Sequence, residues 1–89
     1  MEDPTICWVY RSPLRQEMYL YLIEEDRFEL VPEPLLKRFG TPKLVMNLSL
    51  HPQRKLARAD VTVVLHNLQS QGFHLQLPPQ IQPDLYQGE

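Results

Sequence analysis

Three histidines and one cysteine are the residues of this chain best suited to metal binding or nucleophilic chemistry. His51, His66 and His74 form neither an i, i+4 histidine pair nor part of a Cys-x-x-Cys element, the spacings that zinc sites use. His66 lies beside the apolar stripe of an expected helix, so we expect it to face solvent. The spacing therefore predicts no metal site and no cofactor.

A thiolate activated by a neighbouring base is the second chemistry to consider. Cys7 lies in an expected first strand and His74 in an expected last strand, so the two would meet only if those strands are neighbours that face the same way. The serines lack the Gly-x-Ser-x-Gly pattern of a nucleophile elbow, and most acidic residues fall in one surface-type run. No catalytic residue is predicted.

Four polar side chains alternate with apolar ones on two expected strands, namely Asn47, Ser49, His74 and Gln76. If those strands share a sheet, the four groups are expected to line one side of it, where a covered sheet would be apolar. The strip either faces water or lines a groove for a small ligand or a partner. In the second case Tyr19 and Tyr21 are candidate walls of the groove.

The same two tyrosines, Tyr19 and Tyr21, also have the i, i+2 spacing of aromatic platforms that stack RNA bases. Alternate aromatics are common in half-buried strands, however, and the chain lacks the element order and the glycine-rich aromatic signature of RNA-recognition modules. Packing in the core or at its rim is the favoured reading of both residues.

Positive charge is concentrated between Glu33 and Asp60, a window without any acidic residue, although the net charge of the chain is −2. The window holds six of the nine fixed positive charges: Lys37, Arg38, Lys43, Arg54, Lys55 and Arg58. Arg54, Lys55 and Arg58 precede a helix N-terminus, which favours anions, but Asp60 already supplies a negative group there. This cluster is read as solvated surface or as a weak, salt-sensitive site for RNA or a phosphorylated partner.

The hydrophobic pattern predicts six elements in the order ββαβαβ, an α/β (α+β) chain. They are strands over 6–11 and 17–23 joined as a hairpin, a short helix ending at Gly40, a strand over 43–50, a helix over 60–71 and a strand over 73–77. Asp60 is expected to cap the long helix and Gly72 to end it. A short C-terminal helix within 80–89 would be the last element.

The last three of these elements, strand 43–50, helix 60–71 and strand 73–77, predict a βαβ unit. Its two strands are expected to run parallel if they share a sheet, with a right-handed crossover. Their alternation also predicts that both strands are central. On that basis, Met46→Ala or Leu75→Ala is expected to cost about 2 to 5 kcal/mol.

A chain of 89 residues predicts a single domain over 1–89, with 80–89 as a loose tail or one docked helical turn. A single cysteine, an acidic start and the lack of an apolar run of about 20 residues predict a cytoplasmic location and no membrane insertion.

Several blocks spread over nearly the whole chain resemble the YcgL domain family of gammaproteobacteria. The blocks are Cys7–Ser12, Tyr19–Tyr21, Val31–Pro32, Phe39–Leu50 with its alternating leucines, Leu56–Val61 and Gly72–Pro79. The resemblance implies a compact three-layer α/β/α sandwich and a small cytoplasmic bacterial protein. It implies no activity and carries over no catalytic residue, because the family has no assigned chemistry.

The sequence as a whole favours a non-catalytic interaction or regulatory domain that binds a protein partner. Segregated charge, the polar strip and exposed-type prolines offer recognition surface, while each catalytic pattern is incomplete. Two alternatives stay open. One is a small enzyme or ligand-binding protein that uses the polar side of the sheet, and the other is a weak RNA-binding module.

Overall fold

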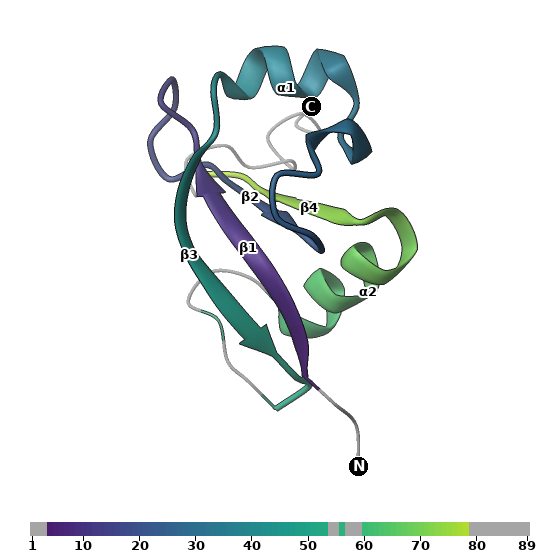
Figure 1. Cartoon of the computed structure of the whole chain (residues 1–89). Coiled ribbons are helices and arrows are strands. Elements are labelled where there is room, and N and C mark those ends of the chain that lie inside the picture. The colour runs from purple at the N-terminus through teal and green to yellow at the C-terminus, as the bar shows by residue number, and fades with distance from the viewer. Residues whose placement is uncertain (1–3, 54–55, 57–59, 79–89) are drawn as a thin grey trace, which may run out of the picture.

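A computed structural model describes residues 4–53, 56 and 60–78, and this part of the chain contains four strands and two α-helices (Figure 1). In chain order the elements are β1 (Thr5–Arg11), β2 (Tyr19–Leu22), a 3-10 helix η1 (Phe28–Leu30), α1 (Glu33–Phe39), β3 (Lys43–Leu50), α2 (Val61–Gln71) and β4 (Phe73–Gln76). The predicted ββαβαβ order is confirmed, and η1 is an addition to it. The short helix expected within 80–89 lies outside the described residues.

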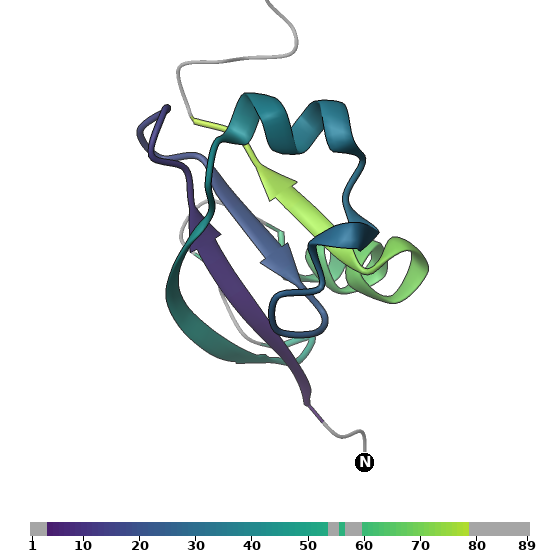
Figure 2. The same cartoon turned by 45° about the horizontal axis from the view of Figure 1, so that its top comes forward.

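The four strands form one antiparallel sheet in the order β3-β1-β2-β4, with the β1–β2 hairpin in the centre (Figure 2). Since every neighbouring pair is antiparallel, β3 and β4 run in opposite directions at opposite edges. The expected parallel βαβ unit is therefore wrong, and so is the prediction that these two strands are central. The hairpin takes the centre because its strands carry apolar side chains on both faces.

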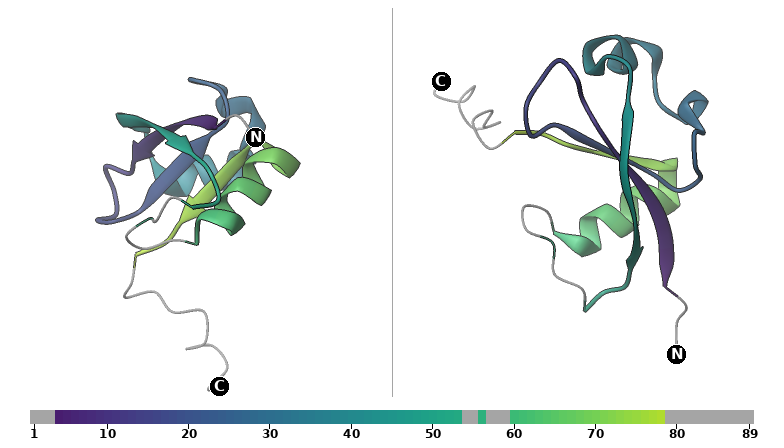
Figure 3. Two further views of the ribbon diagram at one scale, coloured as in Figure 1. Left: turned by 90° about the horizontal axis from the view of Figure 1, so that it is seen from below. Right: turned by 60° about the vertical axis from the view of Figure 1, so that its left-hand side comes forward.

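One helix covers each face of the sheet, which confirms the three-layer α/β/α sandwich (Figure 3). The α2-side core consists of Cys7, Val9, Tyr21, Leu50, Val61, Val64 and Leu68. The α1-side core consists of Tyr10, Met18, Leu20, Leu22, Val31 and Phe39. Neither helix in the described part of the chain has the length and apolar character to cross a bilayer.

Both ends of α2 are fixed by the residues that the sequence singled out. The carboxylate of Asp60 accepts a hydrogen bond from the backbone N–H of Thr62 at 2.9 Å, which satisfies one of the free donors of the first turn. At the other end Gly72 adopts the left-handed conformation, with φ 89° and ψ −5°, and its N–H bonds to the carbonyls of Asn67 and Leu68. The predicted cap and stop are confirmed.

The short helix α1 begins after Pro32 and ends at Gly40, whose N–H donates to the carbonyl of Leu36 at 3.0 Å. Gly40 has a φ of 85°, and a Cβ atom at this position would lie 2.8 Å from Cγ of Leu14. Glycine is therefore required both by the backbone conformation and by the close approach of the β1–β2 loop. This contact brings the end of α1 against the loop that joins the central strands.

Burial along β3 differs from the expected alternation. Leu50 is fully buried and Leu48 half-buried, but the five residues from Lys43 to Asn47 are all exposed. Met46 has 48% of its surface exposed, so the burial on which the large expected stability loss was based is absent, and we now expect a small loss at this position. Leu75 in β4 is half-buried against the α1-side core.

Candidate functional site

The first half of β3 exposes three consecutive apolar side chains at an edge of the sheet. Leu44, Val45 and Met46 have 52%, 42% and 48% of their surface exposed. β3 is the outermost strand on its side and is eight residues long, whereas β4 at the opposite edge has four residues. Natural proteins usually shorten or charge such edges, because an apolar open edge pairs with other strands. This half of β3, Lys43–Asn47, is the candidate site.

A β-bulge sets the direction of these side chains. Val9 of β1 is opposite Met46, and the next residue, Tyr10, is opposite Leu44, so Val45 is the extra residue of β3. Val45 and Met46 line the same hollow on the α2 side of the sheet. Without the bulge, alternation would direct these neighbours to opposite faces. The bulge therefore concentrates apolar surface on one face of the edge strand.

The hollow, called here the β3 groove, has a volume of ≈ 180 Å³. Its lining residues are Val9, Tyr19, Tyr21, Val45, Met46, Leu48, Leu56 and Gln76. Pockets for drug-sized ligands have volumes of about 300 to 1,000 Å³, so this groove is too small for a typical cofactor. Its size and apolar lining suit one or two aliphatic side chains of a partner.

Tyr19, Tyr21 and Gln76, which the sequence singled out, meet in the wall of the β3 groove. The hydroxyl of Tyr21 donates to Oε1 of Gln76 at 3.0 Å, and Tyr19 lies opposite Gln76 in the β2–β4 ladder. Burial raises the pKa of Tyr21, and only 6% of this residue is exposed. Its ring therefore packs in the core, as predicted, and is not a free platform for a base.

His74 lies on the same face of the sheet, but it packs beneath α2. Its Nδ1 is 2.9 Å from the amide nitrogen of Asn67, and its ring makes an edge contact with Tyr21 at a centroid distance of 5.6 Å. An amide nitrogen only donates, so Nδ1 accepts and the ring proton resides on Nε2. Burial lowers the pKa of His74. This histidine is a neutral packing residue with its basic nitrogen already engaged.

The polar strip expected from Asn47, Ser49, His74 and Gln76 does not exist as one surface. Asn47 is opposite Trp8 and thus on the α1 side of the sheet, together with Ser49 two residues on. His74 and Gln76 are on the α2 side, at the other edge. The prediction was wrong because it assumed that the apolar residues of both strands pack into one core. The buried leucines of β3 belong to the α2-side core and the apolar residues of β4 to the α1-side core, so their polar neighbours point to opposite faces.

Cys7 and His74 would meet only on neighbouring strands, and their strands are not neighbours. Cys7 is in β1, and β2 lies between this strand and β4. The thiol belongs to the α2-side core with no exposed surface. His66 is exposed on α2, as expected, and among the described residues no three His, Cys, Asp or Glu side chains gather into a metal-binding group.

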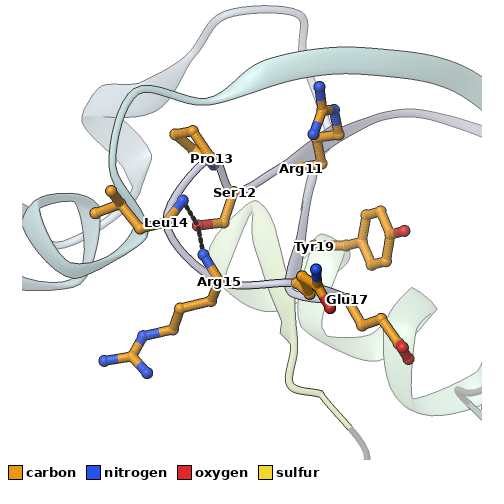
Figure 4. Close-up of a pocket in the computed structure, with 8 residues that line it drawn as sticks. Arg11, Ser12, Pro13, Leu14, Arg15, Glu17 and Tyr19 are labelled. Carbon is orange, nitrogen blue, oxygen red and sulfur yellow. Dashed lines mark hydrogen bonds between the residues drawn. The ribbon is translucent and has the colours of Figure 1, made fainter.

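A second hollow, of ≈ 490 Å³, lies beside the β1–β2 loop, and Figure 4 shows the side chains that line it. The hydroxyl of Ser12 makes three hydrogen bonds in this hollow. It accepts from the backbone N–H groups of Leu14 and Arg15, both at 3.1 Å. It donates to the carbonyl of Phe39 at 2.5 Å. These bonds engage the hydroxyl fully, so Ser12 is structural. Tyr19 lines both hollows, which makes them neighbours.

Positive side chains lie in the second hollow and at the start of β3. Arg11 and Arg15 line the second hollow together with Glu17, and Arg11 is directly opposite Lys43 in the β1–β3 ladder. Within the described part of the chain, neither arginine nor Lys43 forms an ion pair. The basic cluster expected at Arg54, Lys55 and Arg58 lies outside the described residues.

Sequence reasoning missed the exposed half of β3, although one signal was present. In a strand with one buried face, apolar and polar residues alternate, but Leu44, Val45 and Met46 are three apolar residues in succession. Such a run indicates a strand buried on both faces or a bulge in an edge strand. The strand order places β3 at the edge of the sheet, so here the run marks a bulge in an edge strand.

Known proteins resemble this chain over most of its length. The model of the YcgL domain matches residues 7–79. A YcgL domain-containing protein of Pseudomonas putida (strain KT2440) is 58% identical over 74 residues, which cover 83% of this chain and 76% of the relative. Those of Azotobacter vinelandii (strain DJ) and Pseudomonas aeruginosa (strain LESB58) are each 54% identical with the same coverage. The chain therefore belongs to the YcgL domain family.

Proposed function

We propose that this chain is a non-catalytic interaction domain and that it binds a partner protein at the first half of β3. The observation that carries the proposal is the exposure of Leu44, Val45 and Met46 on an eight-residue edge strand. An edge strand offers unpaired backbone groups for affinity, and the β3 groove offers a pocket for a side chain. Together they suit the addition of a partner strand to the sheet.

Hydrogen-bond alternation supports this docking geometry. The N–H of Ser12 bonds to the carbonyl of Met18, so Tyr10 and Trp8 also direct their backbone groups toward β2. The residues opposite them on β3 are Leu44 and Asn47. In an antiparallel ladder these residues direct their N–H and C=O groups away from β1, to the outer edge. A partner strand would find outward donors and acceptors at Leu44 and Asn47, which the bulge at Val45 sets three residues apart.

The alternative functions receive less support from the described residues. A small enzyme or ligand site on a polar strip would need Asn47 and His74 on one face, and they are on different faces. An RNA-binding module that stacks bases on Tyr19 and Tyr21 receives little support, because Tyr21 is buried. We also place the domain in the cytoplasm, because its single cysteine is a buried core residue and suits a reducing compartment.

The test is recovery of partners from cells with the wild type, Val45→Lys/Met46→Lys and a control, Val63→Lys. Val63 is a valine of similar exposure, 48%, but lies on the outer side of α2. Circular dichroism and urea unfolding should first show that all three proteins are folded. Each recovery should be run with and without nuclease.

We expect a protein partner that the wild type and Val63→Lys recover equally, that Val45→Lys/Met46→Lys loses, and that nuclease does not release. Recovery of the same partners by all three proteins would contradict the proposed surface. Loss of every partner on nuclease treatment would favour the RNA-binding alternative instead.

A further inference from the structure

We infer that the partner segment is an extended strand that places a carboxylate beside Arg11 and Lys43 and an aliphatic side chain in the β3 groove. This inference rests on the proposed function, because it names the chemistry of the segment that would dock on β3. The inference rests on one observation: two like charges lie opposite each other at the end of the exposed edge of the sheet.

Arg11 and Lys43 are cross-strand partners, the last residue of β1 and the first of β3. Directly opposed side chains in a sheet are close enough to interact, and like charges at such a position repel. Neither residue has an acidic partner among the described residues. A carboxylate from outside would relieve this repulsion and form the ion pairs that the described residues do not supply.

The charge surrounding this pair has the same sign. Arg15 lies in the adjoining loop hollow with Arg11, while Glu17 is the acidic residue in that lining. Arg15 makes no ion pair among the residues that the structure describes. Among the described residues, Arg11 and Lys43 at this end of β3 and Arg15 in the adjoining hollow outnumber Glu17, which favours an acidic segment over a basic one.

The apolar requirement comes from the neighbouring residues of the same strand. Val45 and Met46 are exposed and border the β3 groove, and Tyr19 connects this groove with the basic hollow. A strand that pairs with the outward backbone groups of Leu44 and Asn47 would pass both features within a few residues. Its pattern would thus combine alternating aliphatic residues with an acidic end.

A second copy of the chain fits this edge less well. If β3 paired antiparallel with β3 of another copy, Lys43 would lie near the far end of the partner strand, at Ser49 and Leu50. That end of β3 carries no carboxylate, so the repulsion between Arg11 and Lys43 would persist. Charge complementarity therefore favours a different, acidic partner.

The experiment is an NMR titration of the full chain, labelled with 15N, at low ionic strength, where exposed charges are least screened. The probe is a short capped peptide with an alternating Val-Thr core and two Glu at each end, so either orientation brings Glu to Lys43. The matched control peptide carries Lys in place of every Glu. Lys43→Glu and, as a control on α1, Lys37→Glu are titrated in the same way.

We expect the Glu peptide to shift the amide resonances of residues 43–47 and to bind about threefold to tenfold more tightly than the Lys peptide, as expected for two exposed ion pairs. Lys43→Glu should abolish this preference, and Lys37→Glu should keep it. Equal binding of both peptides at β3 would overturn the acidic partner but leave the proposed surface intact.

Two further outcomes would overturn the inference at the level of the surface. If neither peptide shifts residues 43–47, strand addition at this edge is wrong, and the proposed function fails with it. If the peptide-free wild type sediments as a dimer and Val45→Lys/Met46→Lys as a monomer, the edge belongs to a second copy.

Discussion

The amide nitrogen of Asn67 in α2 lies 2.9 Å from Nδ1 of His74 in β4, so a hydrogen bond ties the long helix to the edge strand beneath it. The bond requires a neutral imidazole, because a protonated ring would present a second donor to the amide nitrogen. Burial acts in the same direction and lowers the pKa of His74 from its ordinary value of 6.5. Folding and protonation of this residue therefore oppose each other.

We predict that the free energy of unfolding decreases as the pH falls below about 6.5. Above that pH His74 is neutral in both states. Below it the unfolded chain takes up the proton first, because His74 has the higher pKa in the unfolded state. The free energy of unfolding therefore continues to fall until the pH drops below the pKa of His74 in the folded state. Urea unfolding across this range should show the slope in the wild type and in His66→Gln, an exposed control. A His74→Gln variant that retains the slope would contradict the assignment.

Ser12→Ala should destabilise the protein by about 1 to 3 kcal/mol, because it removes a buried hydroxyl that makes three hydrogen bonds. The hydroxyl joins the β1–β2 loop to the end of α1, so the loss should affect the whole domain. Ser70→Ala is the matched control, since Ser70 is exposed and makes one long bond of 3.5 Å. Chemical denaturation measures both, and equal effects would argue against the role of Ser12.

Tyr10→Phe should cost about 1 kcal/mol. The Tyr10 hydroxyl donates to Oδ1 of Asp26 at 3.0 Å and accepts from the Asp26 backbone N–H at 2.8 Å, which fixes the loop between β2 and η1 to the sheet. Tyr19→Phe is the control, because the Tyr19 hydroxyl makes no hydrogen bond within the described part of the chain. Denaturation midpoints that fall equally in both variants would show that the loss does not come from the Asp26 contacts.

Leu20→Ala and Met46→Ala should differ in their effect on stability, because one residue is in the core and the other is at the exposed edge of the sheet. Leu20 is 1% exposed in the α1-side core, so its truncation should cost about 2 to 5 kcal/mol, whereas Met46→Ala should cost less than about 1 kcal/mol. Equilibrium unfolding measures the difference. A large loss at Met46 would mean that this side chain is covered in solution, and the proposed docking surface would have to be abandoned.

The sequence predicted the elements well because their signals are local. Asp60 and Gly72 bound α2 through contacts within one helical turn, and Gly40 ends α1 in the same way. Strand order is not local. The alternation in β3 and β4 is compatible with parallel neighbours or with opposite edges, and only packing of the hairpin between them decides. The false polar strip followed from that single ambiguity.

The candidate site was predicted in part, for the same reason. Tyr19, Tyr21 and Gln76 meet in one groove because they alternate along two paired strands, which a sequence pattern can indicate. The exposed Val45 depends on a bulge and on the position of β3 at the edge, and both arise from pairing with β1. Burial of His74 depends on where α2 crosses the sheet, which the sequence pattern does not specify.

The central position of the β1–β2 hairpin also has a consequence for how the chain folds. Its strands are joined by a short loop, so closing it costs little chain entropy, whereas β3 pairs with β1 across a long stretch of sequence. We expect the hairpin to form early and β3 to join it late. The apolar edge of β3 would then be accessible before the sheet is complete, and a partner that binds it would act on the nascent chain as well as on the folded domain.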